Sequence, residues 1–288
     1  MSRVSLVLPV KNECKALGDL LSGLIELGLS LEIILVDDGS TDETGAIASA
    51  FPIEVIRHPY SKGNGAAIKT GARAASGDVI VFMDADGQHD PADIPRLLAK
   101  LDEGYDMVVG ARDRGSQASF GRSVANGFYN RLATYMAGHR IEDLTSGFRA
   151  VRADKFREFL YLLPNGFSYP TTITMAFFRA GYSVAYIPIK AAQRIGKSHI
   201  HLVKDGVRFL LIIFKIGTLY SPLKLFGPIA LLLFLAGSGW YVHTFLSQGR
   251  FTNMSALLYT GSVMVFLMGL ISEQITALMY KDSSDPKR

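Results

Sequence analysis

The stretch Val79-Ile80-Val81-Phe82-Met83-Asp84-Ala85-Asp86-Gly87-Gln88 decides how this sequence is interpreted. Its first five residues form an apolar run that is typical of a buried strand, and two carboxylates follow where that strand ends. Hard oxygen ligands at the tip of a buried strand suit Mg²⁺ or Mn²⁺, which commonly also binds a phosphate group. The sequence therefore predicts a divalent-cation site beside a phosphorylated ligand.

Apolar runs and helical patterns alternate on both sides of this stretch. Strands are expected at 4–8, 33–36, 53–56, 79–83 and 107–109, and helices at 17–27, 42–50, 65–75 and 94–101. This alternation predicts an α/β fold, a mostly parallel sheet with helices on both faces. Ligands of such sheets bind at the carboxyl ends of the strands. Chemically active residue types fall at those ends: Pro9 to Glu13, Asp37 and Asp38, Asp84 and Asp86, and Arg112.

The helix expected at 42–50 has a local start signal. Either Ser40 or Thr41 is placed to serve as its N-cap, and Asp42 and Glu43 would then complement the helix dipole in the first turn.

The C-terminal third of the chain has a different composition. Residues 225–246 contain no Asp, Glu, Lys or Arg, and 254–272 are again uncharged, with Glu273 following. Each run is long enough for a helix to cross a bilayer, so a two-helix membrane hairpin is expected, with a pair of buried core helices as the alternative. Basic residues flank the hairpin on its outer sides, whereas the connection contains only Arg250. The positive-inside bias predicts that both termini and the α/β domain are cytoplasmic.

These features predict four parts: an α/β domain at 1–200, an interfacial amphipathic helix at 201–220, the hairpin at 221–280 and a polar tail at 281–288. The amphipathic helix would lie on membrane lipids or pack on the soluble domain. The net charge is only +4, and no dense Lys/Arg block indicates nucleic acid binding. Cys14 is the only cysteine, which excludes an internal disulfide, and no N-terminal signal peptide is expected. Homo-oligomer formation is compatible with the sequence, which does not decide it.

Several other nucleotide- and metal-binding patterns are excluded. The first strand is not followed by Gly-x-Gly-x-x-Gly, and residues 84–95 lack the Gly and Glu of a calcium-binding EF-hand loop. The segment Lys62-Gly63-Asn64-Gly65 lacks the Gly-Lys-Ser/Thr of a P-loop. It is interpreted either as a helix-entry turn, which is favoured, or as a backbone cradle for a phosphate or ribose.

The ordered set of motifs resembles the inverting GT-A glycosyltransferases of family 2, and within it the branch similar to dolichyl-phosphate mannose synthase. The resemblance covers Ser5 to about His199. It rests on Pro9-Val-Lys-Asn-Glu13, Val36-Asp-Asp-Gly-Ser40, Lys62-Gly-Asn-Gly65, Asp84-Ala-Asp86-Gly-Gln88, Gly110-Ala-Arg112, Asp143-Leu-Thr-Ser-Gly-Phe-Arg149 and Arg194-Ile-Gly-Lys-Ser198.

This resemblance implies roles for individual residues. The nucleoside would contact Pro9, Lys11, Glu13, Val36 and Asp38, and the nucleotide sugar would contact Asp84, Ala85 and Asp86. The metal, Mg²⁺ or Mn²⁺, would be bound by Asp86 and Gln88. The diphosphate or sugar would be clamped by Arg112, Arg194 and Lys197. The 194–199 loop is one residue shorter than the family pattern and ends in His199, so either Lys197 or His199 would supply its terminal cation.

The expected reaction is transfer of a hexose from a nucleoside diphosphate sugar to a polyprenyl phosphate, with inversion. The acceptor phosphate would be bound by Arg122, Ser146 and Arg149, after the sheet. Asp143 would orient these donors, or act as a weak base if the acceptor is a hydroxyl. Such an acceptor phosphate is already nucleophilic at neutral pH, so a strong base is not required.

The sequence allows three alternatives to this reaction to be compared. A processive polysaccharide synthase would carry Gln-x-x-Arg-Trp, but Trp240 is the only tryptophan and lies in the first apolar run. Transfer to a glycerolipid hydroxyl stays open, as does a non-catalytic membrane regulator that binds nucleotides. GDP-mannose and a UDP-sugar are not distinguished as donors.

Overall fold

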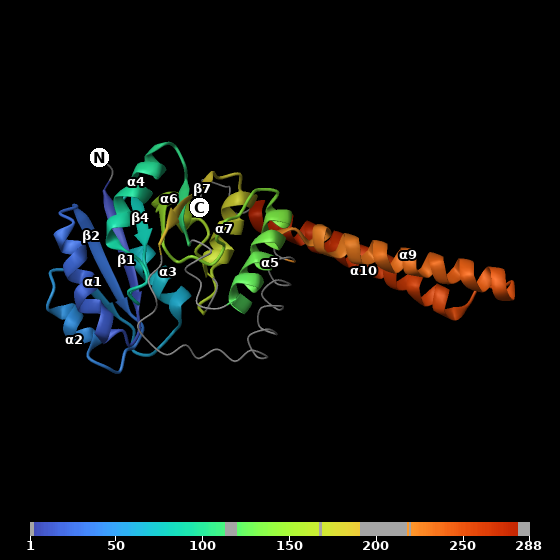
Figure 1. The fold of residues 1–288 in the computed structure, drawn as a ribbon, viewed down its shortest axis with the longest axis horizontal. Coiled ribbons are helices and arrows are strands. Elements are labelled where there is room, and N and C mark those ends of the chain that lie inside the picture. Colours follow the sequence, from blue (N-terminus) through green and yellow to red (C-terminus); the bar gives the residue numbers. More distant parts are fainter. Residues whose placement is uncertain (1–2, 113–119, 167–168, 191–217, 219, 282–288) are drawn as a thin grey trace. The chain divides into compact units, whose positions relative to one another are not determined.

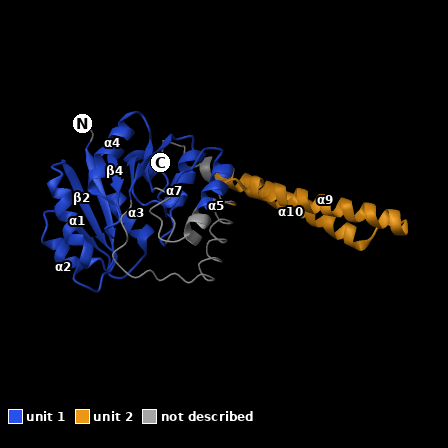
Figure 2. Cartoon of the chain, in the orientation of Figure 1, with its two compact units in different colours: residues 1–199 blue, residues 200–288 orange. Residues whose placement is uncertain are grey.

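The computed structural model describes residues 3–112, 120–166, 169–190, 218 and 220–281 of the 288-residue chain. The chain forms two compact units, Met1–His199 and Ile200–Arg288 (Figure 2). Most of the interfacial helix expected at 201–220, the polar tail, and the 194–199 loop with Arg194, Lys197 and His199 lie outside the described residues.

The first unit is built on a twisted sheet between helices (Figure 1). The sheet has seven strands in the order β3-β2-β1-β4-β6-β5-β7. Its strands are β1 (Val4–Val10), β2 (Leu31–Asp37), β3 (Glu54–Arg57), β4 (Val79–Phe82), β5 (Met107–Arg112), β6 (Arg149–Arg152) and β7 (Val184–Ile189). Every neighbouring pair is parallel except those of β6, which runs antiparallel to β4 and β5. The carboxyl ends of β1, β2, β4 and β5 therefore meet at one edge, together with the start of β6. The predicted mostly parallel α/β sheet is confirmed.

Helices cover both faces of this sheet. They are α1 (Cys14–Glu26), α2 (Thr44–Ser49), α3 (Asn64–Ala74), α4 (Ile94–Asp102), α5 (Phe120–Ala137), α6 (Ala153–Arg157) and α7 (Tyr169–Arg179). On one face, Leu17 of α1 and Leu97 of α4 belong to the same buried cluster as Leu6 and Val81 of the sheet. On the other face α3 lies so close to β1 that a Cβ on Gly71 would collide with the Val7 side chain. Successive strand residues thus face opposite helical layers.

Two local predictions are wrong. The motif that ends at Arg149 does not follow the sheet, because Arg149–Arg152 is itself strand β6 and lies between β4 and β5. A four-residue strand with Arg at each end carries no clear apolar pattern, and pairing on both sides stabilises it instead. Helix α2 begins at Thr44, where the N-cap residue Glu43 makes no side-chain cap and the Thr44 amide donates to Asp42 Oδ1 at 3.0 Å. The expected cap Ser40 accepts instead from the Asn12 amide at 3.0 Å, because the β1–α1 and β2–α2 loops bind each other.

The second unit contains a helical hairpin of α9 (Pro222–Gln248) and α10 (Asn253–Lys281). Both helices are long and apolar enough to cross a membrane. In the most apolar 18-residue stretch of each helix, only 11% and 17% of the residues are buried. The two helices are joined by small and polar residues. Ser262 donates to the Ala230 carbonyl at 2.8 Å, and Tyr259 donates to Ser238 at 3.1 Å. Small residues at such an interface let membrane helices approach closely.

Candidate active site

The loop after β2 is fixed by a carboxylate that accepts hydrogen bonds at both of its oxygens. Asp38 is 3% exposed and accepts four hydrogen bonds, from His58 Nδ1 and Ser61 Oγ at 2.7 Å and from the amides of Lys62 and Gly63 at 2.8 Å. Burial opposes its charge, but the hydrogen bonds, led by that of His58, outweigh burial and lower the pKa of Asp38 to about 2. Asp38 therefore holds the 58–63 segment against the end of β2.

The predicted nucleoside contacts lie around this carboxylate. Pro9 and Val36 pair across β1 and β2 and are buried, and Glu13 immediately precedes α1, its amide donating to Thr44 Oγ1 at 3.0 Å. Lys11 is exposed, and its Nζ donates to Ser61 Oγ at 2.9 Å. The structure thus brings the five residues to one edge of the sheet, whereas contact with a nucleoside stays a prediction.

A cavity of about 500 Å³ opens beside Asp38. Its lining is Gly39, Ser40, Thr41, Arg57, His58 and Pro59. Arg57 faces the buried Asp37, with Nε 3.3 Å from Oδ2, and donates from Nη2 to the Ser40 carbonyl at 2.9 Å. The lining combines apolar surface with the polar groups of Arg57 and His58, as is typical of a pocket for a small ligand such as a nucleoside.

The segment Lys62-Gly63-Asn64-Gly65 is a packing turn. The amide of Gly65 donates to the Gly166 carbonyl at 3.2 Å, and that of Ala66 donates to the Asn165 carbonyl at 2.9 Å. These contacts occupy donors at the start of α3 that a phosphate would otherwise use. The favoured interpretation, a helix-entry turn, therefore fits the structure better than a phosphate cradle does.

The acidic pair follows β4 after one residue, Met83. Asp84, Asp86 and Gln88 are half-buried, Ala85 is buried, and the Gln88 amide donates to Asp86 Oδ1 at 3.2 Å. Among the described residues, no group of three or more His, Cys, Asp or Glu side chains forms a closed metal cage. Magnesium is commonly held by one or two carboxylates together with substrate phosphates. The oxygen donors of this turn fit such a shared cation, and its binding stays a prediction.

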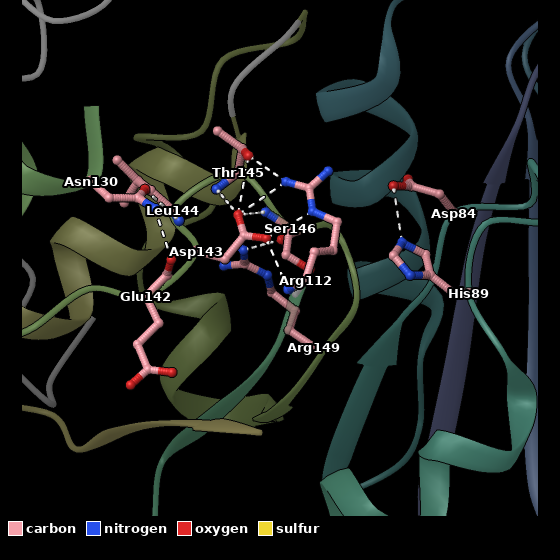
Figure 3. Close-up of polar contacts among 10 residues, drawn as sticks. All are labelled: Asp84, His89, Arg112, Asn130, Glu142, Asp143, Leu144, Thr145, Ser146 and Arg149. Atoms are coloured by element: carbon pink, nitrogen blue, oxygen red, sulfur yellow. Dashed lines mark hydrogen bonds and ion pairs between the residues drawn. The ribbon is translucent and has the colours of Figure 1, made fainter. Parts of the chain in front are cut away.

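His89 closes the turn on its buried side. Its ring stacks on Phe148 with centroids 5.1 Å apart. Figure 3 shows its Nε2 facing Asp84, 3.9 Å from Oδ2. Burial lowers the pKa of His89 to about 4, so the ring is neutral at pH 7.

Arg112, at the end of β5, is held by Asp143. Nε donates to Asp143 Oδ2 at 2.7 Å, Nη2 donates to Oδ1 at 3.0 Å, and Nη2 also donates to Thr145 Oγ1 at 2.6 Å (Figure 3). Asp143 accepts further from the amides of Thr145 and Ser146, at 3.0 and 3.1 Å. Burial alone would raise the pKa of Asp143, but the hydrogen bonds and charge of Arg112 outweigh it and hold that pKa below its usual range.

The three predicted acceptor residues have different positions. Ser146 is 1% exposed, and its Oγ has no hydrogen-bond partner in the part of the chain that the structure describes. Arg149 is fully buried and donates to the carbonyls of Ser146 and Pro170 and to Thr174. This burial favours a structural role for Arg149 over the predicted contact with phosphate. Arg122 belongs to α5, and its side chain lies outside the described residues.

The sequence interpretation missed several contacts that shape this site. His58 and Ser61 fix Asp38, Thr145 supports Arg112, and His89 and Gly147 contact Asp84. Thr145 and Gly147 belong to the predicted 143–149 motif and His89 directly follows the acidic motif, whereas His58 and Ser61 carried no local signal. Apart from that of His89 with Asp84, these contacts join segments that are distant in sequence.

Comparison with known proteins places the chain among sugar transferases. Residues 5–160 match the model of "Glycosyl transferase family 2", and residues 221–278 match that of the "GtrB C-terminal hairpin". Over 164 residues the chain is 38% identical to the undecaprenyl-phosphate 4-deoxy-4-formamido-L-arabinose transferase of Proteus mirabilis, covering 53% of this chain and 49% of that protein. Over 181 residues it is 36% identical to the dolichol-phosphate mannosyltransferase of Pyrococcus furiosus, covering 57% and 50%. The chain spans about half the length of these curated relatives.

Solved structures resemble most of this chain in fold. Glucosyl-3-phosphoglycerate synthase from Mycobacterium tuberculosis, in complex with Mn²⁺, uridine diphosphate and phosphoglyceric acid, aligns with a TM-score of 0.61 at 23% identity. The alignment covers 75% of this chain and 78% of that one.

Proposed function

Since this chain belongs to glycosyl transferase family 2, we propose that it transfers a hexose from a nucleoside diphosphate sugar to a polyprenyl phosphate at a membrane surface. The two relatives described above act, by their names, on undecaprenyl phosphate and dolichol phosphate. The matching hairpin region and two helices of membrane-spanning length support the membrane location.

This proposal rests on one observation, the set of hydrogen bonds that Asp143 accepts. A general base needs a free lone pair and a pKa near the working pH. Asp143 instead accepts from Arg112, Thr145 and Ser146, and its pKa is lowered. It is therefore a poor base for a hydroxyl acceptor. A phosphate monoester, with its second pKa near ~6, is already a nucleophile and needs no base.

Arg112 would stabilise the departing diphosphate. Two of its guanidinium nitrogens donate to Asp143 and Thr145, and we expect the third, Nη1, to donate to the ligand. Asp84 and Asp86 are close enough to raise its pKa by their charge, after the effects of burial and of Asp143. A divalent cation bound by Asp86 and Gln88 would supply further positive charge for the diphosphate. A pre-oriented cationic donor stabilises developing negative charge without reorganisation.

The nucleoside would bind at the ends of β1 and β2, beside the cavity that Arg57 and His58 line. Asp38 already accepts four hydrogen bonds, so it gives no basis for choosing guanine or uracil. GDP-mannose and a UDP-hexose are both candidate donors.

Attachment through the hairpin would keep the enzyme close to an acceptor in the membrane. A polyprenyl acceptor stays in the bilayer because of its long apolar tail. An anchored enzyme meets it by local encounter, at an effective concentration that a free enzyme would not reach.

An acceptor assay tests this function. The full chain in lipid vesicles is incubated with labelled UDP-glucose or GDP-mannose, Mn²⁺, and either undecaprenyl phosphate or diacylglycerol. We expect label in a polyprenyl product that mild acid releases, since anomeric phosphates are acid-labile. An acid-stable glycerolipid product, or no transfer from any nucleotide sugar, would contradict the proposal.

A further inference from the structure

Gly147 lies against the first carboxylate of the acidic pair. A Cβ built on Gly147 would stand 3.0 Å from Asp84 Cγ and 3.2 Å from Oδ1, and closer still to Oδ2. The φ angle of Gly147 is not positive, so an alanine there would carry no backbone strain. The obstacle to a side chain at this position is therefore the Asp84 carboxylate itself.

The residue after Gly147 contacts the same turn. The Phe148 ring stacks on His89, whose Nε2 approaches the Asp84 oxygen that faces Gly147. Two successive residues of the 143–149 motif thus contact the two ends of the 84–89 turn. The contact of Gly147 with Asp84 is part of a packed interface between the two motifs.

The Gly147 backbone is held from the other side. Tyr169, which is 1% exposed, donates from its hydroxyl to the Gly147 carbonyl at 3.1 Å, and Arg149 donates to the Ser146 carbonyl. Both donors are buried and packed, so the loop has little freedom to retreat. The end of a short acidic side chain moves at lower cost than this backbone.

We propose that Gly147 is a positioning residue for Asp84: the missing side chain leaves the space in which that carboxylate is held for the nucleotide sugar. The inference rests on the proposed function, because that function supplies the nucleotide sugar that Asp84 would contact. Tyr169 supports this role by fixing the Gly147 carbonyl.

The test compares binding and folding in one set of variants. Binding of UDP, and of GDP in parallel, is measured with Mn²⁺ by titration calorimetry on the full chain in detergent. Thermal unfolding is recorded for each variant. We expect Gly147→Ala to weaken nucleotide binding about tenfold or more, with a midpoint of unfolding close to that of the wild type. Tyr169→Phe should weaken binding less, in the same direction.

Gly18→Ala is the matched control, since a Cβ on Gly18 meets no atom within 4 Å. A double-mutant cycle then separates positioning from a general structural effect. If Gly147 acts through Asp84, adding Gly147→Ala to Asp84→Ala will weaken binding no further. Losses that multiply in the double variant, or unchanged binding by Gly147→Ala, would overturn the inference while the proposed function stands. A wild-type chain that binds neither nucleotide with Mn²⁺ would overturn both.

Discussion

The guanidinium of Arg112 donates to both carboxylate oxygens of Asp143, from Nε at 2.7 Å and from Nη2 at 3.0 Å. This two-point contact fixes the plane of the guanidinium, which a single contact would leave free to turn. The pair joins the end of β5 to the loop before β6. It therefore orients a cation at the edge of the sheet where the acidic pair lies.

Asp143→Asn should lower kcat about 10²-fold, because a misplaced Arg112 loses charge stabilisation of the transition state. It should also lower the stability of the fold, since Arg112 would keep a partly buried charge without its partner. Activity is measured with the donor and acceptor of the assay above, and folding by thermal unfolding.

Arg112→Lys provides the matching variant, because lysine cannot make the two-point contact. If Asp143 acts by orienting Arg112, the double variant will be little worse than either single variant. Multiplying losses in kcat would indicate that Asp143 acts independently, for example as a base.

Asp38 should make stability depend on acid pH. Its pKa is about 2 in the folded chain against an ordinary value of 3.8, so the unfolded state binds the proton more tightly. The stabilisation is fully present above about pH 4 and is lost as the pH falls towards about 2. Such a shift corresponds to about 2 kcal/mol.

The check is the unfolding midpoint of wild type and Asp38→Asn between pH 7 and pH 2. We expect the wild type to be more stable at pH 7 and the difference to shrink below pH 4. A difference that stays constant across this range would exclude the carboxylate as its source.

Gly65→Ala should destabilise the fold, in contrast to Gly147→Ala. A Cβ on Gly65 would collide with the Pro164 carbonyl and stand 3.0 Å from the Gly166 carbonyl. Backbone atoms cannot move aside as a side-chain end does, so we expect a loss of about 2 kcal/mol or more. Thermal unfolding against Gly18→Ala measures it. An unchanged midpoint would show that the 163–166 segment yields easily.

Much of the sheet was predictable because its strands are continuous apolar runs. Residues 5–10, 34–37 and 79–82 of β1, β2 and β4 are buried, as expected for strands covered by helices on both faces, and such strands appear in the sequence as apolar runs. Strands β6 and β7 were both missed. In β7 burial alternates from residue to residue, and Pro188 interrupts the strand pattern. Strand β6 begins at Arg149, a buried cation that donates to carbonyls and a hydroxyl of α7 and of its own loop. Only the folded chain brings these acceptors together.

The site was predictable to the level of its strand ends. Parallel pairing of β1, β2 and β4 necessarily gathers Glu13, Asp38 and Asp84 at one edge. The sequence gives no sign, however, that Asp38 is saturated by residues 58–63 or that Gly147 touches Asp84. Those contacts depend on loop geometry, which no periodic pattern encodes.

Asp86→Ala should abolish metal-dependent turnover and leave the chain folded. Asp86 is half-buried at a turn, so its loss creates no core cavity, whereas the expected cation would lose a carboxylate ligand. EDTA should stop the wild type, and Mn²⁺ or Mg²⁺ should restore it but not the variant. Transfer that continues in EDTA, or in the variant, would remove the cation from the proposed mechanism.

Two glycines of α10 provide a test of the hairpin. A Cβ on Gly269 would stand 2.7 Å from Phe226 Cβ of α9, whereas a Cβ on Gly261 meets no atom within 4 Å. Because both atoms of the first contact lie at the roots of their side chains, Gly269→Ala must push the helices apart. We expect it to lower the unfolding midpoint of the full chain in detergent. Gly261→Ala should leave that midpoint unchanged or raise it, since alanine favours helix more than glycine does. Equal effects of the two variants would show that close contact between α9 and α10 does not stabilise the hairpin.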